Sequence, residues 1–553
     1  MEKAKPIEAS NFIEREINKD LVNGVYDRVH TRFPPEPNGF LHIGHIKAIN
    51  IDFGIAKKYN GKCNLRFDDT NPDTEDHAFV KSIQDDIKWL GYDWEDRLFF
   101  CSDYFQELYD IATHMITNGD AYVCHLSPEE TKKYRGTLIE PGKDSPYRDR
   151  TVEENLELFE KMKNGEFEEG ECVLRAKIDM QSPNMNMRDP VMYRISYTSH
   201  HRTDDQWCIY PMYDYSHPLA DALEGITHSL CSKEYEDHRP LYNWFVEKSG
   251  LEHKPRQIEF ARIYVSDSLT SKRKIKKLTE EGLVEDWTDP RLVTVAGMRR
   301  RGYTPEALIN FIEAAGVSKA DSEVDFAMLE HFIRENLKYA SPRVMAAKDP
   351  LKVVITNYPE GEIEYLEAPN NVSNKDLGYR EIPFGREIYI EREDFSIDPP
   401  KGYKRLSPGL EVRLFFAYFI KCNEVITDPS TGEVKELRCT YDVETKSGSG
   451  FKGRKPNGTI QWVHADTAED VEIHIFDKLF KDGYEDSDDL SDAVDLNSYV
   501  IFENSKVESS YKDINLNGRF QFIRDSYYYI DPKSKKGNKT VFNQVVSLKS
   551  SWK

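Results

Sequence analysis

The sequence has no long apolar run and no pair of closely spaced cysteines. Nowhere in its 553 residues does an apolar stretch approach the roughly 18 residues that a membrane helix requires. The opening MEKAKPIEASNF lacks the apolar segment of a secretory signal. The eight cysteines are scattered, without a Cys-x-x-Cys pair or another metal-ligand spacing. We therefore expect a cytoplasmic protein with no membrane partner and with reduced thiols rather than disulfides or a cysteine-bound zinc.

Positive charge is also scarce. The chain carries 75 lysines and arginines against 97 aspartates and glutamates, a formal net charge of −22 at pH 7. On average such a surface repels the phosphates of nucleic acids, so any nucleic-acid site must be a local basic surface. The run KRKIKK at 272–277 is one candidate, and an ordinary solvated face is the alternative reading.

Apolar periodicity divides the chain into an α/β part and an all-β part. Residues 28–101 alternate strand-like and helical runs, which predicts a βαβ unit and a parallel sheet. A similar pattern returns at 207–263 after a long insertion, and helices are expected from 284 to 340. After Pro342 the runs are short, β-rich and separated by Gly, Pro, Asn and Asp, which predicts barrels or sandwiches. The expected fold class is multidomain α/β plus all-β.

The stretch PPEPNGFLHIGH, at 34–45, follows a predicted strand and opens a helix near Leu41. A helix start at the edge of a parallel sheet presents free backbone N–H groups and a positive dipole end, which attract phosphate. His42 and His45 stand at i and i+3, so both imidazoles are expected on one face and can donate hydrogen bonds to phosphate oxygens. Gly44 has no Cβ and lets a flat ligand approach the helix. The pair predicts a phosphate site, whereas a lone histidine is more often structural.

A second basic element, SLTSKRK at 268–274, follows the strand-like run RQIEFARI. A lysine on a loop beyond a strand end can neutralise the charge that develops as pyrophosphate leaves a triphosphate. Taken alone, these residues fit a solvent-facing basic turn equally well.

Together these two strings resemble the signature motifs of class I aminoacyl-tRNA synthetases. Further strings along the chain resemble, in order, the glutaminyl-tRNA synthetases of the bacterial type, and the similarity continues through the β-rich half. They are TRFPPEPNGFLHIGH, NLRFDDTNP, YRGTLIEPGKDSPYRDR, LRAKIDM, WCIYPMYD, DALEGITHSLCS and GMRRRGYT. The lysine loop departs from the general class pattern, with Leu269 for the first lysine and Thr270 for methionine.

The resemblance implies a Rossmann-type parallel-sheet catalytic domain with an inserted acceptor-binding domain, a helical subdomain and two C-terminal β-barrels. The expected segments are an N-terminal extension at 1–27, the first catalytic half at 28–101, the acceptor-end insertion at 102–206, the second catalytic half with the SKR loop at 207–275, the helical subdomain at 276–340 and the anticodon-binding barrels at 341–553.

The resemblance further implies a ligase that joins L-glutamine to tRNA(Gln) through a glutaminyl-adenylate, with ATP and Mg²⁺ as the substrate complex and AMP and diphosphate as products. The catalytic residues would be His42, His45 and Lys272. The ATP-binding residues would be Glu36, Pro37, Asn38, His42, Ile43, Gly44, His45, Ile46, Lys47, Ala48, Ser232, Arg262, Ile263, Thr270, Ser271 and Lys272. Asp68 and Tyr213 match the glutamine-binding positions, with Arg32 adjacent. The resemblance also implies a monomer, with no protein-bound metal and no prosthetic group.

Cys231 bears on the choice between glutamine and glutamate. A pocket for glutamate needs a buried cation, and glutamyl enzymes tend to carry arginine where this chain has Cys231 in THSLCS. A neutral thiol suits an amide, and an unpaired buried carboxylate is costly. Three readings stay open: Cys231 as an ordinary core residue, a glutamyl-tRNA synthetase, discriminating or not, and a catalytically dead tRNA-binding paralogue.

The resemblance also implies tRNA contacts. Leu138 matches a residue that wedges open the first base pair, and Asp237 matches a reader of acceptor-stem base edges. The expected readers of anticodon bases are Arg343, Arg405, Gln521 and Arg524. Arginine and glutamine suit the exposed edges of unpaired bases. An acidic surface elsewhere would suppress binding to the wrong nucleic acids.

Overall fold

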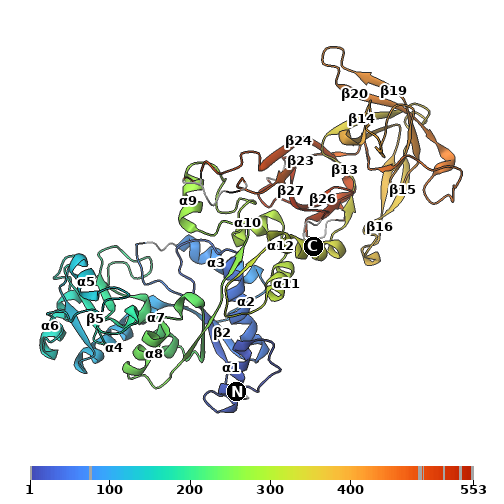
Figure 1. Ribbon diagram of the computed structural model, residues 1–553. Helices are drawn as coiled ribbons and strands as arrows, with labels where there is room; N and C mark the ends of the chain where they lie inside the picture. The colour runs from blue at the N-terminus through green and yellow to red at the C-terminus, as the bar shows by residue number, and fades with distance from the viewer. Residues whose placement is uncertain are drawn as a thin grey trace. The chain divides into compact units, whose positions relative to one another are not determined.

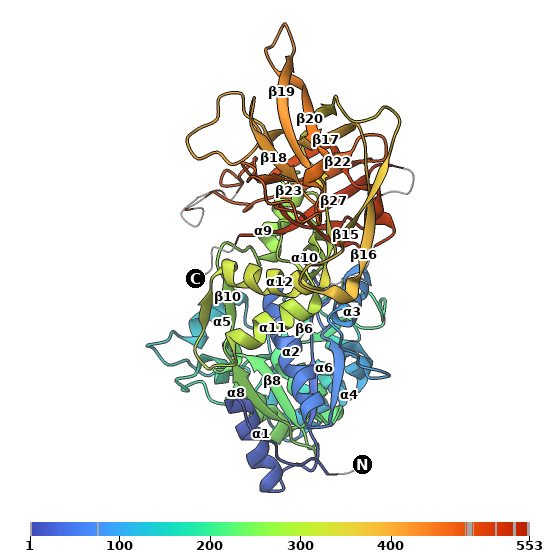
Figure 2. The same cartoon turned by 90° about the vertical axis from the view of Figure 1, so that its right-hand side faces the viewer.

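The computed structural model describes residues 3–73, 77–481, 483, 489, 491–514, 517–534 and 538–549. The chain divides into two compact units, the first made of Met1–Val265 with Ile312–Val324 and the second of Ser266–Phe311 with Asp325–Lys553. Figures 1 and 2 show the course of the chain within each unit. A helix with the length and apolar character needed to span a bilayer is absent from the part of the chain that the structure describes.

The first unit contains α/β and antiparallel β structure. Its principal elements are α1 (Phe12–Val22), β1 (His30–Phe33), α2 (Ile43–Lys58), β2 (Lys62–Phe67), α3 (His77–Trp89), β3 (Leu98–Phe100), α4 (Phe105–Thr117), β4 (Ala121–Cys124), α5 (Pro128–Arg135), α6 (Val152–Lys163), β5 (Val173–Ala176), β6 (Val191–Ile195), β7 (Ile209–Pro211), α7 (Tyr213–Leu223), β8 (His228–Ser232), α8 (Arg239–Lys248), β9 (Arg256–Phe260), β10 (Ile263–Val265) and β11 (Ser322–Val324).

The predicted parallel sheet is present. β2 pairs in parallel with β1 and with β3, and β8 pairs in parallel with β9. Just before β8, the Thr227 N–H donates to the carbonyl of His30 at 2.8 Å, so β8 starts beside β1. Ile43, Ile46 and Ile49 recur at helical spacing along α2, and their side chains are at most 1% exposed. This helix lies between β1 and β2, as a βαβ connection requires.

A separate antiparallel sheet, with the strand order β4-β5-β6-β7, lies between the two parts of the parallel sheet in the sequence. Its core includes apolar side chains of α4, α6 and α7, among them Phe159 and Leu219. β7 pairs with β6, although its residues were expected to open the second catalytic half. Pairing within this sheet buries Ile209 and Tyr210, so the antiparallel layer extends past the predicted boundary at 206.

The second unit contains helices followed by barrel-like sheets. Its principal elements are α9 (Lys272–Glu280), α10 (Val295–Arg301), α11 (Pro305–Ala315, whose end belongs to the first unit), α12 (Phe326–Ala340), β12 (Arg343–Val344), β13 (Ala346–Ala347), β14 (Pro350–Ile355), β15 (Glu364–Pro369), β16 (Tyr379–Phe384), β17 (Glu387–Glu391), β18 (Glu411–Leu414), β19 (Phe419–Thr427), β20 (Val434–Asp442), β21 (Thr459–Ile460), β22 (Val463–His464), β23 (Glu469–Phe476), β24 (Tyr499–Val507), β25 (Arg519–Phe522), β26 (Ser526–Ile530) and β27 (Thr540–Ser547).

Two seven-stranded sheets form most of the β structure. One has the order β21-β18-β19-β20-β14-β17-β22, and the other has the order β12-β25-β26-β27-β23-β24-β13. β14 alternates between half-buried and buried residues, which is the pattern of a strand with one face toward a core. Each sheet encloses its own apolar cluster, one around Trp462 and the other around Phe522. The all-β expectation for this half is confirmed.

Candidate functional site

The two histidines form the N-terminal cap of α2. The helix begins at Ile43 rather than near Leu41, because His42 is its N-cap. Nδ1 of His42 accepts the N–H of Gly44 at 3.1 Å, and Nδ1 of His45 accepts the N–H of His42 at 3.0 Å. A ring nitrogen that accepts a hydrogen bond carries no proton, so the proton of each imidazole lies on Nε2. Both rings, whose centroids are 3.9 Å apart, therefore carry an Nε2–H donor.

Gly44 leaves room for the His42 ring. A Cβ at this position would lie 3.0 Å from Cε1 and 3.1 Å from Nδ1 of His42. Any larger residue at this position would therefore push against the His42 ring that forms the cap.

The other candidate ATP residues near this turn differ in exposure. The side chains of Ile43 and Ile46 are buried in the core, so only their backbone atoms can face a ligand. Lys47 is 2% exposed, and burial lowers the pKa of its amine. Glu36 accepts a hydrogen bond from the Asn38 amide. The turn residues Pro37 and Asn38 are buried and half-buried, and Ala48 is half-buried.

Three further ATP candidates lie where strands meet loops in the first unit. Ser232 ends β8, and its hydroxyl donates to Glu234 at 2.7 Å. Arg262 forms an ion pair with the same glutamate, and Ile263 begins β10. The Arg262 N–H also donates to Asp321 at 3.0 Å.

The lysine motif belongs to the second unit. Ser271 is the N-cap of α9 and Lys272 is its first residue, so the motif is a helix start rather than an extended loop. Leu269, which stands where the general pattern has lysine, is 9% exposed and packs in a cluster with Ile275. Thr270 is exposed. The departure at position 269 thus anchors the motif to an apolar cluster.

Two of the predicted glutamine-binding residues, Asp68 and Tyr213, line a cavity of about 420 Å³. Its lining consists of Glu36, Asp68, Thr70, Asn71, Asp73, Arg194, Pro211, Met212 and Tyr213. Burial raises the pKa of the Asp68 carboxyl to about 7, and the charge of Glu36 adds to the rise. The Thr70 hydroxyl donates to Asp68 at 3.1 Å. Tyr213 begins α7 and stacks on His217, with ring centroids 4.9 Å apart.

Arg32 and Cys231 lie deeper, in a buried polar network. The Arg32 side chain is 0% exposed, and it donates to Asp221 at 3.0 Å, to Ser229 at 2.6 Å and to the Cys231 sulfur at 3.3 Å. A cation therefore lies next to Cys231, contrary to the simple picture of a neutral thiol alone. Burial opposes ionisation of Asp221, yet the charge of Arg32 outweighs it and holds the Asp221 pKa below its usual range.

The network also contains residues that the sequence did not indicate. Arg66 contacts Asp221 at 2.8 Å and Glu224 at 3.2 Å. The second oxygen of Glu224 accepts the Asn64 amide at 2.8 Å, so both of its oxygens are acceptors, as in an ionised carboxylate. Two guanidinium groups therefore meet two carboxylates. A signal was present in DALEG, where Asp221 interrupts the apolar face of a buried helix.

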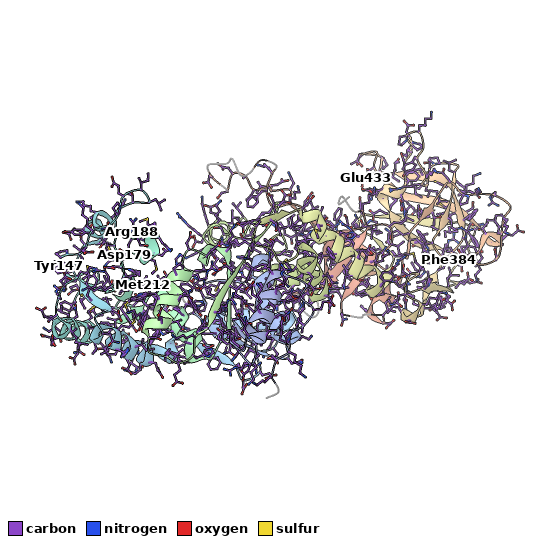
Figure 3. The ribbon with its side chains drawn as sticks, turned by 60° about the horizontal axis from the view of Figure 1, so that its bottom comes forward. Tyr147, Asp179, Arg188, Met212, Phe384 and Glu433 are labelled. Carbon is purple, nitrogen blue, oxygen red and sulfur yellow. The ribbon has the colours of Figure 1, made fainter. Side chains whose placement is uncertain are left out.

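The loop that carries Leu138 is hydrogen-bonded to one buried arginine. Its side chain is 82% exposed, and that of Ile139 is 94% exposed. Beneath this loop lies Arg188 (labelled in Figure 3), which is 3% exposed. Its guanidinium donates to the carbonyls of Ser182 at 2.7 Å, Arg135 at 2.8 Å, Thr137 at 2.8 Å and Glu140 at 3.0 Å. Arg188 was not predicted from the sequence, because these carbonyls come together only in the folded loop.

Asp237, the other acceptor-stem candidate, is exposed between β8 and α8. Its carbonyl accepts hydrogen bonds from the amides of Asn184 at 2.7 Å and Asn186 at 3.3 Å. These two hydrogen bonds hold the backbone at Asp237 and do not involve its carboxylate.

The four anticodon candidates form two pairs in the second unit. Arg343 on β12 is the register partner of Gln521 on β25. Arg524 follows in the turn after β25, with a φ of 66° in the left-handed region. Its two terminal nitrogens donate to Asp394 at 2.9 and 3.0 Å, and Arg405 lies 3.2 Å from the same carboxylate.

Known families match the chain over nearly all of its length. The model described as "tRNA synthetases class I (E and Q), catalytic domain" matches residues 28–339. Two models for the anticodon binding domain of the same class match residues 341–442 and 459–531.

Curated relatives are similar from end to end. The glutamine–tRNA ligase of Clostridium perfringens is 56% identical over 547 residues, which cover 99% of this chain and 99% of the relative. That of Clostridium kluyveri is 54% identical over 550 residues, with 99% and 98% covered. That of Pseudomonas syringae pv. tomato is 49% identical over 554 residues, with 100% and 97% covered.

Proposed function

The chain belongs to the class I tRNA synthetases of the glutamate and glutamine family, and from this premise we propose how it ligates glutamine to tRNA. Relatives that are 49–56% identical over the full length are glutamine–tRNA ligases, and this similarity is the observation that carries the function. The chain joins L-glutamine to tRNA(Gln) with ATP and releases AMP and diphosphate. Glutamyl ligation has less support from these relatives.

In the first step, the carboxylate of glutamine attacks the α-phosphorus of ATP, which is bound as its Mg²⁺ complex, and diphosphate leaves. The nucleophile comes from the substrate, so positioning and charge neutralisation carry the reaction. In our proposal the Nε2–H groups of His42 and His45 donate to phosphate oxygens beside the positive end of α2. Lys272 supplies positive charge as diphosphate leaves.

The remaining ATP candidates would surround the nucleotide. We propose this role for Glu36, Pro37, Asn38, Ile43, Gly44, Ile46, Lys47, Ala48, Ser232, Arg262, Ile263, Thr270 and Ser271. For the two isoleucines the role falls to the backbone, because their side chains are in the core.

We propose that glutamine occupies the cavity between Asp68 and Tyr213. The Asp68 carboxylate would pair with the α-ammonium, and the Tyr213 hydroxyl can both donate to and accept from the carboxamide. Arg32 and Cys231 would act from behind this cavity. Because the charge of Arg32 is matched by Asp221, the network offers no surplus cation to a glutamate side chain.

For tRNA, we propose that Leu138 and Asp237 contact the acceptor end and that Arg343, Arg405, Gln521 and Arg524 read the anticodon. The exposure of Leu138 and the grouping of the four anticodon candidates support this division. We further propose that the enzyme acts as a monomer in the cytoplasm, with no protein-bound metal and no membrane partner.

The test is charging of unfractionated tRNA by the purified protein with labelled glutamine and, separately, labelled glutamate, each with ATP and Mg²⁺. We expect glutamine alone to be attached. Attachment of glutamate would assign the chain to the glutamyl branch, and no attachment of either would identify a catalytically dead paralogue.

A further inference from the structure

The carboxylate of Asp394 lies between two arginines from different parts of the β structure. Its side chain is 3% exposed, whereas those of Arg524 and Arg405 are 28% and 36% exposed. Arg524 donates to both carboxylate oxygens, at 2.9 and 3.0 Å, and Nε of Arg405 lies 3.2 Å from one of them. A buried acid thus holds two guanidinium groups that reach the surface.

The backbone is also fixed on both sides of this acid. Arg524 adopts a φ of 66°, which an L-amino acid rarely populates without support from its surroundings. On the other side, the Asn457 amide donates to the carbonyls of Tyr403 at 3.2 Å and Arg405 at 2.7 Å. The Leu406 N–H donates to the Asp394 carbonyl at 2.9 Å. The two arginines are therefore held at their backbones as well as at their side chains.

Two carboxylates lie near this pair of guanidinium groups, and Asp394 contacts both arginines. Glu393, which is 81% exposed, lies 3.9 Å from Arg405. Without Asp394, the two cations would repel each other and separate, because both side chains are partly exposed to solvent. A planar guanidinium group with a fixed orientation is suited to recognising base edges and phosphates.

We propose that Asp394 is a positioning residue that sets Arg405 and Arg524 as one unit for reading the anticodon. The two arginines lie in the two different anticodon-domain matches, 341–442 and 459–531, so the acid also joins these parts at the reading surface. This inference rests on the proposed anticodon role of the two arginines. Asp394 touches no base itself and acts through its partners.

The test compares Asp394→Asn with the unchanged enzyme on two transcripts, tRNA(Gln) and the same tRNA with a substituted anticodon. We expect kcat/KM for tRNA(Gln) to fall about tenfold to a hundredfold, mainly through KM for tRNA. We expect little change in kcat/KM for the substituted transcript. The transcript ratio, which is kcat/KM for tRNA(Gln) divided by kcat/KM for the substituted transcript, should therefore move toward one. A merely structural role of Asp394 would lower kcat/KM equally for both transcripts, and that result would overturn the inference.

The matched control is Asp531→Asn. Asp531 is also a buried acid of the second unit, and it holds Arg300 at 2.9 Å without contacting the anticodon candidates. Its substitution should leave the transcript ratio unchanged.

The conservative variant Asp394→Glu keeps the negative charge, so it should retain a larger transcript ratio than Asp394→Asn. If thermal unfolding shows that Asp394→Asn does not fold, the test rests on Asp394→Glu. A transcript ratio of Asp394→Glu equal to that of the unchanged enzyme would then refute precise positioning by Asp394.

The variants Arg405→Ala and Arg524→Ala separate this inference from the proposed function. If both leave the transcript ratio intact, the anticodon role itself is wrong. If both reduce the ratio and Asp394→Asn does not, only the role of Asp394 is wrong.

Discussion

The buried carboxyl of Asp68 predicts an unusual pH dependence of glutamine use. Burial raises its pKa to about 7, so roughly half of the enzyme carries a protonated Asp68 at neutral pH. A protonated carboxyl cannot pair with an α-ammonium, whereas the ionised form can. Glutamine binding is therefore supported at pH values above the raised pKa of Asp68 and is lost as the pH falls through that pKa.

The expected magnitude follows from this pKa. At one pH unit below it, about one enzyme molecule in eleven is in the binding form, so kcat/KM for glutamine should fall about tenfold between pH 8 and pH 6. kcat/KM is the proper quantity because it reports the free enzyme. The assay is steady-state charging of tRNA at saturating ATP and tRNA, at pH values from 5.5 to 8.5.

Asp68→Asn is the matched variant. It should lower kcat/KM for glutamine about tenfold to a hundredfold, the range for a lost charged hydrogen bond, and it should remove the inflection near neutral pH. A flat profile in the unchanged enzyme, or an inflection that persists in Asp68→Asn, would refute the assignment of Asp68 to the ammonium.

Three further outcomes are expected from the site. His45→Ala should reduce the rate of adenylate formation about 10²–10³-fold with the thermal unfolding midpoint nearly unchanged, and an unaltered rate would contradict the phosphate role. Gly44→Ala should displace the His42 ring, since the new methyl would lie 3.0 Å from Cε1, and should cost about 0.5–2 kcal/mol in unfolding free energy along with activity. Arg188→Met should lower kcat/KM for tRNA about tenfold or more and match Leu138→Ala, with KM for ATP unchanged. Normal tRNA kinetics in Arg188→Met would show that the loop keeps its shape without those four hydrogen bonds.

Local patterns predicted the elements of the fold well. Helical spacing identified α2, and short β-rich runs identified the all-β half. The predicted helix start was two residues early, because the sequence alone does not reveal that the His42 side chain closes the cap. Likewise, β7 was recognisable as a strand, but its pairing with β6 depends on which core buries its side chains.

Long-range polar pairs were beyond prediction. Arg32 and Asp221 are 189 positions apart, and no local pattern links them. The same holds for Arg188 and the carbonyl of Thr137, which are 51 positions apart, and for Asp394 and Arg524, which are 130 positions apart. Motif resemblance indicates candidate positions for substrate contact, but it carries no information on the residues that orient those side chains.

The paired charges behind the proposed glutamine cavity have a consequence for how this pocket can change over evolution. Removing one member of a buried ion pair strands its partner and costs about 3–5 kcal/mol, a large part of the stability of a typical domain. Arg66 is bound to both Asp221 and Glu224, so a single replacement disturbs the whole group. We therefore expect a switch of amino-acid preference through these residues to need two compensating substitutions.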